Sequence, residues 1–159
     1  MTIAIYAGTF DPFTRGHEDV LGRASLLFDH VIVAVACDCN KEPVFNFQER
    51  ISLAQECIRP FANVSVCGFR GLLADFVRQK KANVLIRGVR NSSDFDYECR
   101  LANINRHLNP DIQTVFFPPL AETQTISGTM VREIVRLGGD VSAFVAPHVD
   151  QALRAKLKH

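Results

Sequence analysis

Short apolar runs alternate with segments of helical periodicity along the chain. The apolar runs lack regularly alternating polar positions and are rich in β-branched residues, a pattern typical of strands buried on both faces of a parallel sheet. Between them, apolar residues recur every three or four positions, which predicts helices with one face packed on that sheet. The predicted strands are residues 3–7, 31–36, 64–66, 83–86 and 114–117, and the predicted helices are residues 16–28, 47–58, 72–81, 92–108, 127–137 and 147–156.

This alternation predicts an α/β fold. Consecutive parallel strands need right-handed crossover connections, and a helix in each connection places helices on both faces of the sheet. The chain has 159 residues with 47% hydrophobic content, enough for one well-buried core and too few for two. We therefore expect a single domain over residues 1–159, with a doubly wound, Rossmann-like, five-stranded parallel sheet.

Polar and cationic residues follow the ends of the predicted strands. In open parallel sheets, ligands bind outside the carboxyl ends of the strands, so residues scattered in sequence meet at one edge. The candidates for this edge, in strand order, are Thr9, Lys41, Leu73, Arg87, Arg90 and residues 123–129.

Charge and cysteine content narrow the possible functions. The formal net charge is +1, so no global field attracts nucleic acid or an acidic membrane, and anion specificity has to come from a few placed cations. The five cysteines lack CxxC spacing and are typical of reduced cytosolic thiols. No signal peptide, lipidation motif or apolar run of about 18 residues occurs, so we expect a cytoplasmic protein without a membrane partner.

The strongest chemical signal lies in residues 3–17, which read IAIYAGTFDPFTRGH. A buried strand leads into a tight turn and then into a helix start, where unpaired N–H groups and the helix dipole favour a phosphate. Gly8 and Gly16 remove side chains that would keep a phosphate away from the backbone. The stretch has neither the P-loop lysine nor the GxGxxG fingerprint, and it ends instead in Thr14-Arg15-Gly16-His17.

The unit GTFDPxTxGH resembles the [HT]xGH motif of the nucleotidyltransferase superfamily. Along nearly its whole length, the chain is similar to the bacterial phosphopantetheine adenylyltransferase family. The most specific block is VLIRGVRNSSDFDYE at residues 84–98, and QERISLAQ at 48–55 and NRHLNP at 105–110 support it. The resemblance implies the strand order 3-2-1-4-5.

The family reaction transfers AMP from ATP to 4′-phosphopantetheine and gives dephospho-CoA and pyrophosphate, a step of coenzyme A biosynthesis. The acceptor phosphate is already an anionic nucleophile that attacks the α-phosphate in line, so no serine, cysteine or general base is needed. The resemblance further implies Mg²⁺ bound with the ATP phosphates, a homohexamer, and feedback by coenzyme A. The low net charge, in turn, leads us to expect no nucleic-acid partner.

The resemblance also implies the roles of individual residues, without any protein metal ligand. His17 contacts the α-phosphate and stabilises the transition state, with Lys41 and Arg90 as further catalytic residues. The implied acceptor-binding residues are Thr9, Lys41, Leu73 and Arg87. The implied ATP-binding residues are Thr9, Phe10, His17, Gly88, Val89, Arg90, Glu98, Thr123, Gln124, Thr125, Ile126, Ser127, Gly128 and Thr129.

Several of these residues also have purely structural explanations. His17 could donate to a neighbouring carbonyl at the helix start, and Lys41 could be an ordinary solvated lysine. Glu98 could be a surface charge beside Arg100. A cation at a buried strand end needs an anionic partner, so Arg87 and Arg90 could pair with internal carboxylates; the nearest in sequence are Asp94, Asp96 and Glu98.

Two other functions are consistent with the motifs. One is a small nucleotidyltransferase with a different acceptor, such as nicotinamide mononucleotide or glycerol phosphate. The other is a nucleotide-binding module without turnover.

The chain also departs from the family, which usually has an aromatic residue near Thr123 and a hydroxyl residue where this chain has Gly128. Because backbone N–H groups hold a phosphate at a helix start, glycine preserves that cradle.

Overall fold

Five parallel strands form one sheet in the computed structural model, which describes residues 1–39 and 42–157. The strands are β1 (Ile3–Gly8), β2 (His30–Ala36), β3 (Val64–Phe69), β4 (Val84–Gly88) and β5 (Gln113–Phe117). They lie in the order β3-β2-β1-β4-β5, and every neighbouring pair is parallel. The predicted doubly wound α/β sheet and its strand order are confirmed.

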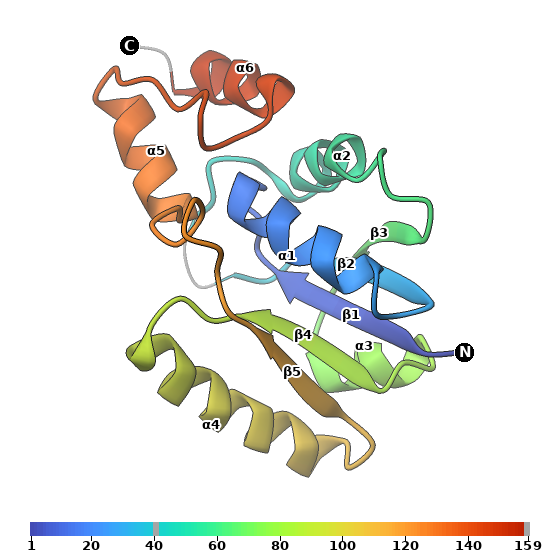
Figure 1. The fold of residues 1–159 in the computed structure, drawn as a ribbon. Coiled ribbons are helices and arrows are strands. Elements are labelled where there is room, and N and C mark those ends of the chain that lie inside the picture. Colours follow the sequence, from blue (N-terminus) through green and yellow to red (C-terminus); the bar gives the residue numbers. More distant parts are fainter. Residues whose placement is uncertain (40–41, 158–159) are drawn as a thin grey trace.

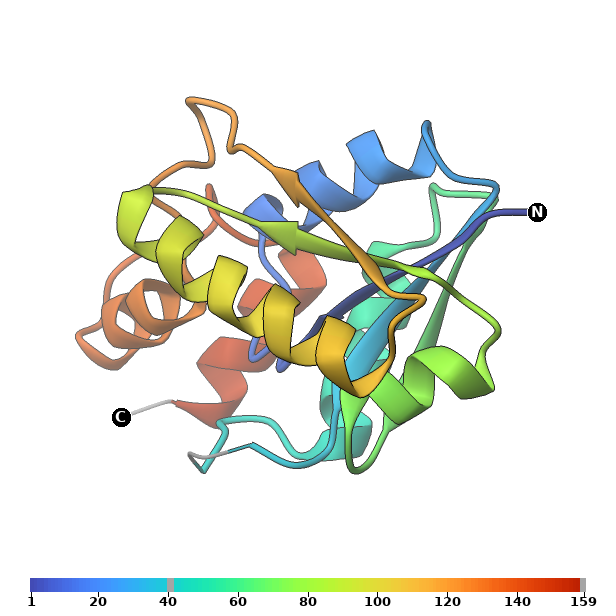
Figure 2. The same ribbon diagram turned by 90° about the horizontal axis from the view of Figure 1, so that it is seen from below.

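Helices cover both faces of this sheet (Figure 1). On one face lie α1 (Arg15–Ser25) and α2 (Phe47–Cys57). On the other lie α3 (Leu73–Gln79) and α4 (Ser92–Leu108), which Figure 2 shows from below. The last two helices, α5 (Gly128–Arg136) and α6 (Pro147–Lys156), pack together on the side of α1 and α2. Among the described residues, none of the helices has the length and apolar character needed to cross a bilayer.

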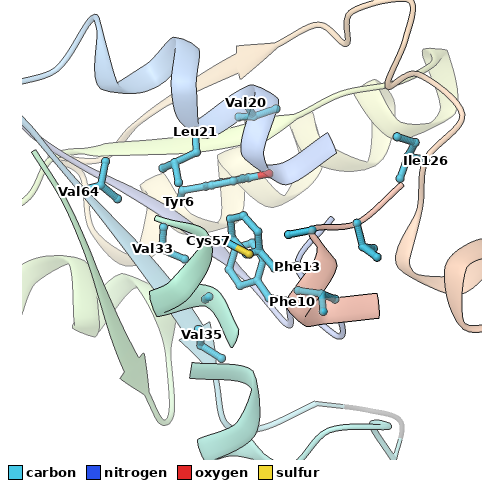
Figure 3. Close-up of a cluster of buried hydrophobic side chains, with 14 of the residues drawn as sticks. Tyr6, Phe10, Phe13, Val20, Leu21, Val33, Val35, Cys57, Val64 and Ile126 are labelled. Carbon is cyan, nitrogen blue, oxygen red and sulfur yellow. The ribbon is translucent and has the colours of Figure 1, made fainter. Parts of the chain in front are cut away.

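The pleat of the strands divides the core into two clusters. Ala4 and Tyr6 of β1 join the cluster that includes residues of α1, α2, α5 and α6, whereas Ile5 and Ala7 join the cluster against α3. Figure 3 shows the first cluster, in which the ring of Phe10 packs against the rings of both Tyr6 and Phe13. The loop after β1 is therefore anchored in the core by its own aromatic side chains.

The predicted helix and strand boundaries differ from the structure by a few residues at most, and α4 and α6 have the predicted bounds. Two differences reach three residues: α1 was predicted to end at residue 28 and ends at Ser25, and β3 was predicted over 64–66 and continues to Phe69. Cys67 and Gly68 pair with Ala34 and Val35 of β2, so the hydrogen-bonded ladder overrides the low strand propensity of glycine.

Gly68 lies where α2 packs closely against the sheet. A Cβ atom at this position would lie 2.8 Å from Cδ1 of Ile51 and closer still to the ring of Phe47. Both side chains belong to α2. The close approach of α2 to β3 therefore depends on the missing side chain at residue 68.

We expect Gly68→Ala to lower the free energy of unfolding by about 1–3 kcal/mol, because the added methyl group overpacks the contact between α2 and β3. Gly22→Ala in α1 is the matched control. A Cβ atom there meets only the ring of Phe61, at 3.5 Å, so the helix-propensity gain of up to about 1 kcal/mol should dominate. Urea unfolding measures the change in the free energy of unfolding, which should be negative for Gly68→Ala and positive for Gly22→Ala. Equal changes in the two variants would contradict the overpacking argument.

Candidate active site

A pocket of about 890 Å³ opens between the carboxyl ends of β1 and β4 and the first turns of α1 and α5. The order of strands reverses between β1 and β4, the switch point where ligands bind in open α/β sheets. The structure brings most of the predicted site residues together in its wall. They are Thr9, Phe10, His17, Arg87, Gly88, Val89, Arg90, Thr123, Ile126, Ser127, Gly128 and Thr129.

Other predicted residues are not part of this wall as far as the structure describes it. Leu73 begins α3 and packs against the second core cluster. Glu98 lies behind the wall, and Gln124 and Thr125 belong to the adjoining turn. Lys41 lies outside the described residues, so its catalytic and acceptor-binding roles stay predictions.

The first turn of α1 is held by a reciprocal cap between Thr14 and His17. The Thr14 hydroxyl accepts a hydrogen bond from the backbone N–H of His17 at 3.4 Å, and Nδ1 of His17 accepts one from the backbone N–H of Thr14 at 2.9 Å. This is a capping box in which histidine takes the place usually held by glutamate or glutamine. The alternative, donation from the ring to a neighbouring carbonyl, has no recorded bond among the described residues.

The cap determines which nitrogen of His17 carries the proton. Because Nδ1 accepts from a backbone N–H group, the neutral ring is protonated at Nε2. The ring centroid lies 4.9 Å from that of Phe10 and 5.2 Å from that of Phe13. Burial, with a smaller contribution from the positive charge of Arg90, lowers the pKa of His17 to about 4. At pH 7 His17 is thus a neutral ring with a fixed Nε2–H donor at the pocket.

The turn before α1 has an unusual backbone conformation at Phe10, whose φ is 52°. Non-glycine residues rarely adopt this left-handed conformation, and it persists only where the surroundings enforce it. Here the Phe10 ring is 4% exposed and packs edge-on against Tyr6 and His17. Packing of the ring thus holds the turn in a shape that leaves Thr9 exposed at the pocket.

Arg87, near the end of β4, forms a forked ion pair with Glu98 of α4. Its Nε and NH2 groups donate to the two carboxylate oxygens at 2.7 and 2.8 Å, and its NH1 group donates to the carbonyl of Ala7 at 3.1 Å. Glu98 is 8% exposed, so the surface-charge explanation for it is wrong. The pairing matches the structural explanation for Arg87, yet two of its five N–H groups have no partner among the described residues.

Arg90 links the loop after β4 to the loop before α5. Its NH1 group donates to the carbonyl of Ile126 at 2.9 Å, and its Nε lies 3.6 Å from a carboxylate oxygen of Asp94. The Arg90 side chain is 42% exposed. This contact brings a segment that follows β5 to the same pocket as the end of β4.

The first turn of α5 supplies the opposite wall of the pocket. Ser127 is the N-cap, and its hydroxyl accepts from the backbone N–H of Met130 at 3.1 Å. The N–H groups of Gly128 and Thr129 have no recorded partner among the described residues. Both residues line the pocket, so two donors at a helix start are available to an anion.

Three arginines with contacts in or beside this region were not predicted from the sequence. Arg132 and Arg136, on α5, line the pocket. Arg50 of α2 is 1% exposed and donates to three carbonyls, those of Thr9 at 2.9 Å, Ala36 at 2.6 Å and Phe45 at 3.1 Å. The spacing of Arg132 four residues after Gly128 was the available signal, since residues four apart share a helix face.

Outside the pocket, Cys57 contacts His148, with the sulfur 3.5 Å from Nε2. The pair superficially resembles a cysteine–histidine nucleophile. Burial raises the pKa of the Cys57 thiol to about 12, so the reactive thiolate is suppressed rather than stabilised. The contact is therefore a structural link between α2 and α6.

Comparisons with known proteins identify the family of the chain. The model of the cytidylyltransferase-like family matches residues 5–134. A phosphopantetheine adenylyltransferase of Azoarcus sp. strain BH72 is 56% identical over 98% of this chain and 95% of its own length. The proteins of the same name from Bordetella avium and Paraburkholderia xenovorans are 54% and 52% identical over 99% of this chain and 95% and 92% of their own lengths.

The chain belongs to the phosphopantetheine adenylyltransferase family. Solved structures extend its fold to more distant nucleotidyltransferases. A Vibrio parahaemolyticus structure assigned as a nicotinate-nucleotide adenylyltransferase has a TM-score of 0.74, with 18% identity over 96% of this chain and 99% of its own. The Plasmodium falciparum nicotinic acid mononucleotide adenylyltransferase complexed with NaAD has a TM-score of 0.72 and 17% identity, over 98% and 95% of the two chains. At these identities the likeness concerns the fold.

We expect the buried neutral state of His17 to make stability depend on pH. Burial penalises protonation of His17 in the folded state but not in the unfolded state. The contribution of the neutral ring to the free energy of unfolding is therefore complete above pH 6.5 and is lost as the pH falls through 4. The difference is at most about 3 kcal/mol. Denaturant unfolding between pH 7 and 4 measures it against His17→Gln, which keeps a side-chain acceptor for the cap. Parallel pH profiles for the two proteins would contradict the assigned pKa.

Proposed function

We propose that this protein transfers the adenylyl group of ATP to 4′-phosphopantetheine and releases pyrophosphate. The observation that carries the proposal is the identity of 52–56%, over nearly the full chain, to proteins named for that activity. The product is dephospho-CoA, so the protein acts in coenzyme A biosynthesis. The pocket between β1, β4 and α5 is where ATP and the acceptor would meet.

The reaction requires positioning and charge stabilisation rather than a protein nucleophile. An oxygen of the acceptor phosphate forms a bond to the α-phosphorus of ATP, and the bond from that phosphorus to the bridging oxygen of the β-phosphate breaks. The bonding electron pair leaves with pyrophosphate. No proton has to be removed from the attacking phosphate oxygen, so a general base is unnecessary.

His17 is the group that we assign to the α-phosphate. Its Nε2–H donor is neutral at pH 7 and is held in position by the bond from Thr14 to Nδ1. A donor fixed before the reaction lowers the barrier if it matches the crowded in-line geometry better than ground-state ATP. Because the ring is neutral, it can donate a hydrogen bond without delivering its proton to the phosphate.

We assign the acceptor phosphate to the region between Thr9 and Arg87, with Lys41 as a further proposed contact. Arg87 is oriented by its fork to Glu98 and retains N–H groups for a phosphate. Glu98 would then act through Arg87 and orient it, rather than by direct contact with ATP. We propose that Arg90 and the first turn of α5 bind ATP.

Further properties are proposed from the resemblance to the family. ATP would enter as its Mg²⁺ complex, in which the ion shields the triphosphate and is held largely by phosphate oxygens and water. The protein would work in the cytoplasm, assemble into a homohexamer and respond to coenzyme A as a feedback ligand. Light scattering of the purified protein tests the assembly, since a mass near the 17.7 kDa of one chain would exclude the hexamer.

A panel of nucleotides and acceptors tests the reaction itself. We expect pyrophosphate release with ATP and 4′-phosphopantetheine, and much less with CTP or with nicotinamide mononucleotide or glycerol phosphate as acceptor. Pantetheine without its phosphate should be almost inactive, because it lacks the nucleophile. Turnover with another acceptor would identify a different nucleotidyltransferase, and ATP binding without any turnover would identify a catalytically silent module.

His17→Ala tests the transition-state role. Losing one preorganised donor typically costs about 2.7–4 kcal/mol, so kcat should fall on the order of a hundred- to a thousandfold. The KM values for ATP and phosphopantetheine should change far less, and circular dichroism should show an intact fold. Label from ATP labelled at the α-phosphate should not stay on the denatured parent protein. A folded variant with the parent kcat, or retained label, would refute the assignment.

A further inference from the structure

Residues 118–127 lead from β5 to α5 and contribute Pro119, Thr123 and Ile126 to the lining of the pocket (Figure 1). We call this segment the strap. It contains neither helix nor strand, and its own backbone bonds are those of two turns. The N–H group of Thr123 donates to the carbonyl of Leu120, and that of Ile126 donates to the carbonyl of Thr123, each at 3.1 Å. Such a segment keeps one shape only if its surroundings hold it.

Two side chains of α1 hold the strap from the side of that helix. Arg23 donates through Nε and NH2 to the carboxylate of Asp19, at 3.2 and 2.8 Å. Its NH2 group also donates to the carbonyl of Pro118 at 2.7 Å, and its guanidinium carbon lies 5.5 Å from the centre of the Phe117 ring. The pair therefore connects α1 to the end of β5 and to the first residue of the strap.

The middle of the strap contacts the same carboxylate. The Thr123 hydroxyl lies 3.4 Å from Oδ2 of Asp19 and 3.4 Å from the carbonyl oxygen of Leu120. Its single proton favours the charged acceptor, because hydrogen bonds to ionised groups are the stronger ones. The Asp19 side chain is 10% exposed and that of Arg23 is 30% exposed. Water and salt screen such a pair less than they screen a pair at the open surface.

The anchor of the strap lies on the helix that carries His17. At its other end, the strap is bonded to the loop after β4, where NH1 of Arg90 donates to the carbonyl of Ile126 at 2.9 Å. The next residue, Ser127, is the N-cap of α5. The distance between His17 and the start of α5 is therefore fixed partly through α1 itself.

We propose that Asp19 and Arg23 are positioning residues that hold the strap and the start of α5 in register with His17, and that they thereby set the affinity for ATP. This assignment rests on the proposed adenylyl transfer. Arg23 is absent from the described lining of the pocket, so its effect on a ligand has to pass through the strap. Without the anchor the strap samples more conformations, and the apparent affinity falls by the fraction that is competent to bind.

The experiment compares the two substrates by calorimetry. For Arg23→Met the affinity for ATP should be about two- to tenfold weaker, the range of one net intramolecular hydrogen bond. The affinity for 4′-phosphopantetheine should stay at the parent value, because its proposed contacts lie away from the strap. Arg23→Lys should restore part of the loss, since lysine returns the charge and a donor without the fork.

Arg154→Met on α6 is the matched control. Arg154 has the same spacing to Asp150 that Arg23 has to Asp19, and its Nε donates to that carboxylate at 2.9 Å. Its side chain is 60% exposed and is not part of the described lining of the pocket. This variant should bind both substrates as the parent protein does.

Hydrogen exchange measures the strap directly. The amides of Thr123 and Ile126 should exchange faster in Arg23→Met than in the parent protein, while those of α2 should not change. Equal losses of affinity for both substrates would show that Arg23 only stabilises the fold. Unchanged ATP affinity, with or without faster exchange, would show that the anchor does not control ATP binding. Because neither measurement needs turnover, an ATP affinity that depends on Arg23 in a protein that does not transfer AMP would refute the proposed function alone.

Thr123→Val tests the anchor from the strap. Valine keeps the shape of the side chain and removes the hydroxyl that contacts Asp19. Since Thr123 and Arg23 share this carboxylate, the double variant should lose less ATP affinity than the product of the two single losses. Losses that multiply, or no loss from Thr123→Val, would contradict a shared anchor.

Discussion

The buried guanidinium of Arg50 links three parts of the chain on which the pocket depends. It bonds the carbonyl of Thr9 after β1, the carbonyl of Ala36 at the end of β2, and that of Phe45 just before α2. Arg50 is 1% exposed, so its guanidinium has given up water, and these carbonyls replace the hydrogen bonds that it lost. The same side chain therefore holds the loop that contains Thr9 and the end of β2 at Ala36.

A second constraint on the pocket is that its donors are positioned by bonds that also complete secondary structure. Nδ1 of His17 closes the first turn of α1, and the Ser127 hydroxyl closes the first turn of α5. Such a site needs little rearrangement when a charged ligand arrives, because the dipoles already point at the place where charge will lie. The left-handed Phe10 between β1 and α1 fits this picture, since strain at a functional turn is tolerated where packing enforces it.

Most of the fold could be predicted from the sequence because buried strands and amphipathic helices have distinct periods. β3 was predicted too short because Gly68 is a poor strand former, and its packing partner Phe47 is far away in sequence. A residue that follows a strand can be predicted to lie at the carboxyl edge of the sheet, but the direction of its side chain cannot be predicted from that position. Leu73 packs against the second core cluster and is absent from the described lining of the pocket, so its acceptor-binding role stays a prediction. Arg132 was missed because its relevance depends on the carbonyl of Asp11, 121 positions earlier in the chain.

The pocket gathers arginines in a chain whose formal net charge is only +1. Long-range electrostatic steering depends on the net field outside the protein, so small phosphates should reach this site by ordinary diffusion, at rates that ionic strength changes little. Once a phosphate is inside, it meets cations that are partly shielded from water and salt. The charge that a phosphate meets here is thus set by a few placed side chains rather than by the protein as a whole.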